Sequence, residues 1–259
     1  MQIPLTDHLA PAVTDNPLPG HFIMAYSNTN WIGTSLLIVL AIIPGLLISW
    51  YIYRLDKHEK EPRAPLAIAF GSGLVAAWIA IRAEFGAAAL MPESPELLRA
   101  LVFSFLVVAL IEESLKWIFL IAYPYRQTFF NEPFDGIIYA VMIAMGMATF
   151  ENVLYAERYD LTTILLRAFT AVPAHGLFAV IMGYYVGKAH FTETGSWRLL
   201  LKGWLLALGL HGAYDFFLLQ KAYKELALLA ALTLAFCFYL AQRLLAEHQE
   251  DSPFKKEDD

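Results

Sequence analysis

Seven long apolar segments constrain what this chain of 259 residues can fold into. About 20 mostly apolar residues are needed to cross the hydrocarbon core of a bilayer as a helix, and each segment reaches that length. Lipid offers the backbone no hydrogen bonds, so such segments must be helices or closed barrels, and they lack the alternation of barrel strands. The sequence therefore predicts an all-α, polytopic transmembrane helical bundle with about seven spans. They run approximately Ile32–Tyr53, Leu66–Leu90, Leu97–Tyr123, Phe134–Tyr155, Thr162–Gly187, Leu199–Leu219 and Leu226–Leu245.

The composition supports a membrane protein and argues against other classes. Hydrophobic residues make up 58% of the chain and charged residues only 16%, whereas about a quarter of a soluble domain is charged. Nothing in the sequence supports nucleic-acid binding, so we expect a lipid bilayer and no nucleic acid around the chain. The single cysteine, Cys237, has no second cysteine with which to form an intrachain disulfide.

Three regions follow from these segments. Residues 1–31 are expected to be an extracytoplasmic N-terminal segment, which lacks Lys and Arg and therefore does not resemble a removable signal peptide. Residues 32–246 are expected to form a multi-pass membrane domain that carries the candidate active site. Residues 247–259 form a polar, charged tail, and this composition predicts disorder on the cytoplasmic side.

The basic residues predict the orientation of the chain in the membrane. With seven spans and the N-terminus outside, eleven Lys and Arg residues fall at cytoplasmic ends and five at outer ends, which the positive-inside rule favours. The cytoplasmic ones are Arg54, Lys57, Lys60, Arg63, Arg126, Lys188, Arg198, Lys202, Arg243, Lys255 and Lys256. The outer ones are Arg99, Arg158, Arg167, Lys221 and Lys224.

Charged side chains interrupt the third apolar segment. Glu112 and Glu113 stand side by side there, and Lys116 follows within about one helical turn. A charge at the centre of a bilayer costs at least ~2.5 kcal/mol, so these residues are functional-site candidates by default. Other apolar segments place polar residues at roughly overlapping depth, and we expect all of them to converge on one site. These are Glu151, His175, His211 and Asp215.

Helical spacing predicts how some of these residues pair. Glu112 and Lys116 are i,i+4 neighbours and can form an ion pair, whereas Glu113 lies about 100° round the helix and is expected to point elsewhere. In the fourth segment, the Tyr155 hydroxyl can donate to Glu151 four residues earlier.

The sixth segment contains a further i,i+4 pair, His211 and Asp215. A carboxylate that accepts one ring N–H fixes the tautomer and leaves the other nitrogen for chemistry. In the fifth segment, Pro173 precedes His175 by two residues and can kink the helix.

Carboxylates and imidazoles converging from four helices suit two kinds of chemistry. They can activate a water molecule by general-base catalysis, or bind a divalent metal such as zinc that does so. Either route serves peptide hydrolysis, in which Lys116, Tyr155 or a histidine could donate to the developing oxyanion. The candidate catalytic residues are Glu112, Glu113, Glu151, His175 and His211, with Lys116, Tyr155 and Asp215 in support. The candidate metal ligands are Glu113, Glu151, His175 and His211.

Other interpretations of the same residues stay open. An intramembrane ion pair can be purely structural, and the chain could then be a non-catalytic scaffold that recognises transmembrane helices. Intramembrane Glu, His and Lys also form relays in ion-coupled transporters, although the sequence shows no pair of broken helices in an inverted repeat. Arg82 and Glu84, within the second segment, are expected to be a packing or interface feature.

Five stretches of the sequence together resemble the PrsW family of membrane proteases. They cover roughly Trp50 to Gln220. Four of them lie in the family's order on separate segments, and the stretch at Arg54–Arg63 resembles the family's first cytoplasmic loop. The stretches are R-L-D-K-H-E-K-E-P-R at Arg54–Arg63, E-E-S-L-K at Glu112–Lys116, F-E-N-V-L-Y at Phe150–Tyr155, the lone His175, and H-G-A-Y-D at His211–Asp215. The resemblance implies an intramembrane endopeptidase, dependent on glutamate or metal, in the inner membrane of a bacterial cell. Its implied substrate is a membrane-bound protein, such as an anti-sigma factor cut by site-1 cleavage.

The resemblance also implies roles for individual residues. The superfamily contains the CAAX prenyl endopeptidases, in which the first glutamate of the pair activates water and the histidine of the last motif helps form the oxyanion hole. Those roles fall on Glu112 and His211. Asp215 stands where the CAAX enzymes usually have Asn, and an ionised Asp cannot donate a hydrogen bond. We therefore expect Asp215 to orient His211 or to approach a metal.

Overall fold

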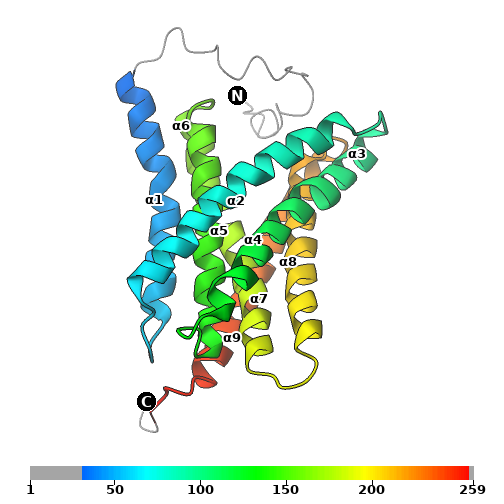
Figure 1. Ribbon diagram of the computed structural model, residues 1–259. Coiled ribbons are helices and arrows are strands. Elements are labelled where there is room, and N and C mark those ends of the chain that lie inside the picture. The colour runs from blue at the N-terminus through cyan, green and yellow to red at the C-terminus, as the bar shows by residue number, and fades with distance from the viewer. Residues whose placement is uncertain (1–30, 257–259) are drawn as a thin grey trace.

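The computed structural model describes residues 31–256, which fold into a bundle of helices (Figure 1). All regular structure in this part of the chain is helical, which confirms the all-α class. The expected extracytoplasmic segment, residues 1–31, lies outside the described residues except for its last position. The elements are α1 (Trp31–Leu55), α2 (Arg63–Ala89), α3 (Glu96–Val102), the π-helix η2 (Phe103–Ala109), α4 (Leu110–Ala122), the 3-10 turn η3 (Pro124–Arg126), α5 (Pro133–Ala156), α6 (Leu161–Phe169), α7 (Ala171–His190), α8 (Ser196–Leu219), the 3-10 turn η4 (Lys224–Leu226) and α9 (Ala227–Glu250).

Each predicted segment corresponds to one helix or to consecutive helices. α1, α2, α5, α8 and α9 match single segments, whereas α3, η2 and α4 together form the third and α6 and α7 form the fifth. The third segment is thus divided among shorter elements, and α8 carries Lys202, His211 and Asp215. The third and the sixth segments are therefore not among the helices that are long and apolar enough to cross a membrane. The candidate membrane-spanning helices within the described residues are Ser35–Leu55, Arg63–Ala89, Pro133–Ala156, Leu161–His190 and Lys224–Glu250.

Two segments break where the backbone departs from an α-helix. η2 inserts a wider π-type turn directly before the turn that carries Glu112 and Glu113, and such turns inside helices are frequent at functional sites. Thr170 leaves the helical region (φ −126°, ψ −75°) and separates α6 from α7. Pro173 then lies in the first turn of α7, where a missing N–H is tolerated. His175 therefore lies near the start of a new helix.

α5 is the central helix, and α2 and α7 pack closely against it. Figure 1 shows α2 crossing α5 at a steep angle. Gly73 and Gly146 let the two backbones touch at this crossing, because a Cβ on either residue would collide with the backbone of the other helix. Gly136 and Gly183 have the same role between α5 and α7. Close approach through small residues is a common packing mode of membrane helices.

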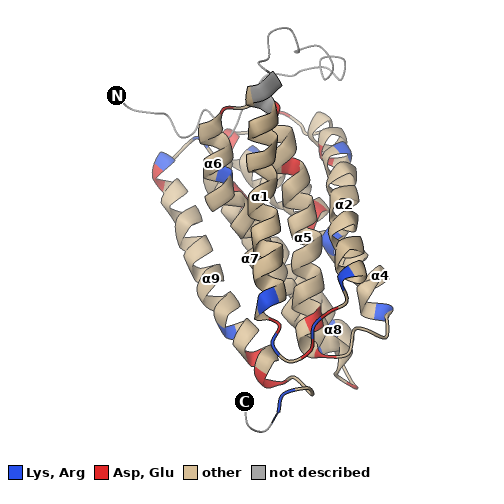
Figure 2. Cartoon of the chain, turned by 90° about the vertical axis from the view of Figure 1, so that its left-hand side faces the viewer, with Lys and Arg blue, Asp and Glu red and all other residues tan. Residues whose placement is uncertain are grey.

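The outer faces of α1 and α9 are apolar along most of their length (Figure 2). Soluble monomers rarely expose contiguous apolar patches larger than a few hundred Å². These faces fit contact with lipid, as expected for a membrane protein. Their exposed side chains include Leu36, Val39, Leu47 and Trp50 on α1, and Leu228, Leu232, Phe236 and Tyr239 on α9.

The C-terminal tail differs from the expected disordered segment that starts at residue 247. α9 continues to Glu250, and Ser252 beyond it is buried, with its hydroxyl donating to Glu132 before α5. Gln249 donates to the last carbonyl of α1 at 2.7 Å. Composition alone did not predict this packing, because polar tail residues can bond to the polar end of a bundle. We call this end, formed by the α1–α2 loop (residues 56–62), the start of α5 and the end of α9, the lower end, as drawn in Figure 1.

Candidate active site

Lys116 on α4 lies at the centre of a buried cluster of charged side chains. Its Nζ is 2.7 Å from Glu113 Oε1 and 3.7 Å from Glu112 Oε2. The same Nζ is 2.9 Å from Nδ1 of His175 on α7. These four residues are at most 5% exposed. Because an isolated buried charge is very costly, each group depends on its neighbours for compensation.

The ion pair of Glu112 with Lys116 expected from spacing is present, but the expectation that Glu113 points elsewhere is wrong. Glu113 is the nearer partner of Lys116, and it does not point away from the site. Both i,i+3 and i,i+4 neighbours lie within reach of a lysine on a helix.

His211 on α8 lies between two carboxylates. Its Nε2 is 3.3 Å from Asp215 Oδ2, in agreement with the i,i+4 spacing, and its Nδ1 is 2.7 Å from Glu113 Oε1. The ring also stacks on Phe178, with the ring centroids 5.2 Å apart. A histidine held at both nitrogens and on one face has a fixed orientation, as acid–base chemistry and metal ligation both require.

Glu151 on α5 joins the cluster through a histidine and an arginine. Its Oε2 is 3.5 Å from Nε2 of His175 and 3.2 Å from Nη2 of Arg167 on α6. Nε of Arg167 donates to Asn152 at 2.7 Å. The expected contact from Tyr155 is replaced by this arginine, whose Cζ lies 3.9 Å from the centre of the Tyr155 ring. Tyr155 therefore supports Arg167 rather than Glu151 directly.

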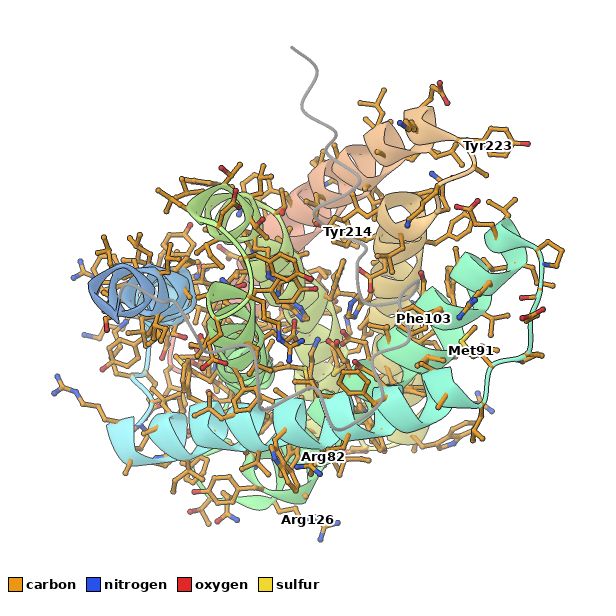
Figure 3. All side chains as sticks on the ribbon, turned by 90° about the horizontal axis from the view of Figure 1, so that it is seen from above. Arg82, Met91, Phe103, Arg126, Tyr214 and Tyr223 are labelled. Carbon is orange, nitrogen blue, oxygen red and sulfur yellow. The ribbon has the colours of Figure 1, made fainter. Side chains whose placement is uncertain are left out.

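Glu84 on α2 is a further acid of the site, although sequence reasoning assigned it to packing. Its Oε1 is buried and accepts no hydrogen bond from the described residues. Arg82, grouped with it from sequence, instead lies over the Trp78 ring, on the side of α2 away from α8 (Figure 3). Glu84 and Arg167 were both missed, yet each is a charged residue within an apolar segment, and that signal could have found them. Glu84 interacts electrostatically with Glu151, His211, Asp215 and Lys116.

One carboxylate and two imidazoles meet closely enough to share a metal ion. Glu112, His175 and His211 each offer one ligand atom, and these atoms lie within 4.8 Å of one another. The expected ligand set had Glu113 and Glu151 in place of Glu112. Those two acids accept hydrogen bonds from a lysine and an arginine, whereas Glu112 Oε2 is buried without a hydrogen-bond donor in the described part of the chain. Nζ of Lys116 and Nδ1 of His175 lie 3.7 and 3.6 Å from this oxygen, beyond hydrogen-bond distance, so it can still accept a bond from water or bind a metal.

The fold and the site together define a class of protein. Carboxylates, imidazoles and a lysine from α2, α4, α5, α7 and α8 surround one buried position in a helical membrane protein. Such a group can take a proton from water or hold a divalent ion, and both are ways to activate water. The class is that of an intramembrane hydrolase.

Comparison with known proteins identifies the family. A family model described as PrsW family intramembrane metalloprotease matches residues 61–241, a stretch that contains every site residue described above. The chain therefore belongs to the PrsW family of intramembrane metalloproteases, and it is an intramembrane protease.

Similar proteins named Protease PrsW occur in several bacteria. The one from Geobacillus kaustophilus (strain HTA426) is 36% identical over 186 residues, which cover 71% of this chain and 80% of that protein. The one from Bacillus subtilis (strain 168) is 33% identical over 184 residues, 70% of this chain and 82% of that protein. The one from Clostridioides difficile (strain 630) is 35% identical over 191 residues, 71% and 79% of the two chains. No solved structure matches this chain.

Proposed function

We propose that the chain hydrolyses a peptide bond of a membrane-bound protein, with Glu112 as the general base that activates water. One observation carries this assignment. Of the adjacent pair, Glu113 is bonded to Lys116 and His211, whereas Glu112 has a buried oxygen without a hydrogen-bond donor among the described residues. The resemblance to the family suggests a membrane-anchored regulator, such as an anti-sigma factor, as the substrate.

The carboxylates beside His211 orient its ring so that one N–H can donate to the developing oxyanion. Glu113 holds Nδ1 at 2.7 Å and Asp215 lies 3.3 Å from Nε2. The contact to Asp215 is the longer one, so it is the contact that a substrate oxygen can replace. His211 would then donate to the developing oxyanion while Glu113 keeps the ring in place.

His175 is oriented in a related way. The Lys116 ammonium can only donate, so it bonds to an Nδ1 that accepts, and the Nε2–H is then directed at Glu151. Glu151 is in turn fixed by Arg167. This chain of contacts links α4, α7, α5 and α6, and it sets the tautomer of His175.

The family description implies a metal, and the residues present fit one. Glu112, His175 and His211 form a donor set of one carboxylate and two imidazoles, as in catalytic zinc sites. Zinc bound there would acidify a water molecule and polarise the scissile carbonyl. Lys116 bonds to the same His175, so the ammonium and a divalent ion would compete for this ligand.

We further propose that the protein lies in the inner membrane of a bacterial cell, with the N-terminus outside and the lower end in the cytoplasm. The basic residues around the α1–α2 loop support this orientation, since loops rich in Lys and Arg stay in the cytoplasm. They are Arg54, Lys57, Lys60 and Arg63.

The proposed reaction is tested by following the truncated form of a membrane-anchored candidate substrate in cells that carry Glu112→Gln. We expect processing to fall by at least ~10²-fold, the low end of what general acid–base catalysis contributes. Expression and insertion should persist, because the change removes a buried charge. Glu157→Gln, at an exposed carboxylate just beyond α5, is the control and should process at the parental rate. Parental processing by Glu112→Gln would favour the non-catalytic scaffold.

Metal analysis of the purified protein distinguishes the two ways of activating water. Stoichiometric zinc that is lost in His175→Ala, together with processing that a chelator stops, would support a metal held by the three ligands. Full activity in metal-free protein would assign the activation of water to Glu112 alone.

A further inference from the structure

A second cluster of acids lies at the lower end and joins the α1–α2 loop to the first turn of α5. Glu59 and Glu61 come from the loop and Asp135 from the helix. Each offers one carboxylate oxygen, and these three oxygens lie within 4.8 Å of one another. Asp56, also in the loop, interacts electrostatically with Glu61. We call Glu59, Glu61 and Asp135 the acidic cage.

The two most buried acids of the cage each have one oxygen held by the protein and one oxygen without a donor. Oδ2 of Asp135 accepts from the backbone N–H groups of Asn131 at 2.6 Å and Glu132 at 2.8 Å. Oε2 of Glu61 accepts from the Tyr139 hydroxyl. The other oxygens, Oδ1 of Asp135 and Oε1 of Glu61, are buried and accept no bond from an N–H group or a hydroxyl of the described residues. Their residues are only 1% and 2% exposed, so the orphan oxygens have little access to water. The two carboxyl groups face each other closely enough to share a proton, and a cation would take the place of that proton.

The basic side chains of the loop are engaged elsewhere. Nζ of Lys60 bonds to carbonyls near the end of α1, and it interacts electrostatically with Asp56. Lys57 and His58 interact with Glu250 at the end of α9. These contacts stabilise the loop but place no cation between the acids of the cage.

Buried acids in this state indicate a missing positive partner. Three acids converge in the cage, and Glu61 and Asp135 are buried, each with one oxygen that no N–H group or hydroxyl of another described residue reaches. The side chains of the protein therefore supply little positive charge to balance the carboxylates of the acidic cage. The converging donors are all oxygens, with no nitrogen or sulfur ligand in the cage, and such donor sets suit hard divalent cations.

We propose that a hard divalent cation, Mg²⁺ or Ca²⁺, binds in the acidic cage and fastens the α1–α2 loop to the start of α5. Three carboxylates leave room for water ligands, which both ions accept. The loop leads directly into α2, which crosses α5 and carries Glu84 to the active site. A cation in the cage would therefore hold α2 in place from its lower end.

Separate titrations with Mg²⁺ and Ca²⁺ test the proposal, with binding to the purified full-length chain in detergent measured by calorimetry. All samples carry Glu112→Gln, which removes one ligand of the active-site metal group and keeps the outcome independent of the proposed protease mechanism. We expect one ion per chain, and binding weaker by at least about tenfold in Asp135→Asn and in Glu59→Gln, because each loses a charged ligand. Glu193→Gln, at an exposed acid of the α7–α8 loop, should bind like the parent.

Thermal unfolding gives a second readout. An ion that binds only the folded chain raises the unfolding temperature, and this rise should disappear in the two cage variants. Asp135 also accepts hydrogen bonds from the backbone before α5, so Asp135→Asn could weaken the start of this helix as well as the cation site. Glu59 is a half-buried loop residue, and Glu59→Gln therefore reports the loss of a ligand alone. The proposal is overturned if neither ion produces heat or a thermal shift in the parent, or if both cage variants bind the ion as the parent does.

Discussion

Lys116 shows how strongly a buried site depends on one side chain. Its ammonium lies within 3.7 Å of Glu112, Glu113 and His175, and the side chain is almost completely buried. At bilayer depth no bulk water can take over the role of this cation. Its loss would leave fully buried Glu113 with only His211 beside it.

We expect Lys116→Met to lower the free energy of unfolding by about 3–5 kcal/mol, the usual cost of removing one partner from a buried ion pair. Methionine keeps much of the volume, so the effect reports the charge. The measurement is denaturant unfolding of the purified protein, with Lys221→Met, at an exposed lysine before α9, as the control. Unchanged stability in Lys116→Met would mean that Glu113 is protonated in the native protein.

Sequence could predict contacts within one helix better than contacts between helices. The i,i+4 spacing predicted the pair His211 and Asp215, and the rule on intramembrane charge found most members of the site. The contacts between helices depend on the rotation and depth of each helix, which spacing does not report. These are the contacts of Glu113 with His211, of Lys116 with His175 and of Glu151 with Arg167.

At the scale of helices, apolar length predicted where the segments lie but not where they break. The ends of α1, α2, α5, α8 and α9 fall within a few residues of the predicted ones. The π-helix η2 has an apolar composition like that of any span, so sequence carried no sign of it. The break at Thr170 differs, because Pro173 nearby gave a local signal.

The crossing of α2 and α5 supplies a prediction at this scale. A Cβ added to Gly73 would collide with the carbonyl of Ile143, whereas a Cβ added to Gly71 would meet no atom within 4 Å. We expect Gly73→Ala to lower the thermal unfolding temperature and the processing rate, because α2 must move and Glu84 moves with it. Gly71→Ala, two residues away on the same helix, should be neutral or stabilise by up to about 1 kcal/mol. Equal stability of the two variants would contradict the close backbone contact at this crossing.

At the scale of the whole molecule, each loop lies at one of the two ends of the bundle. The orientation of the chain in the membrane can therefore be tested by labelling one loop at each end. Glu157 lies in the loop between α5 and α6, and Glu193 lies in the loop at the lower end between α7 and α8. With the N-terminus outside, a membrane-impermeant thiol reagent applied to intact cells should label Glu157→Cys and not Glu193→Cys. Cys237 is buried and should give little background. The reverse labelling pattern would invert the proposed topology.

The active site holds more acids than permanent cations. The acids are Glu84, Glu112, Glu113, Glu151 and Asp215, and the permanent cations are Lys116 and Arg167. Lipid supplies no counterions, so electroneutrality must come from protons on acids and histidines or from a captured divalent ion. The arrival of such an ion would expel protons from the site, and its binding would strengthen as the pH rises. A protease built in this way would be sensitive to the acidity of the compartment with which its site exchanges protons.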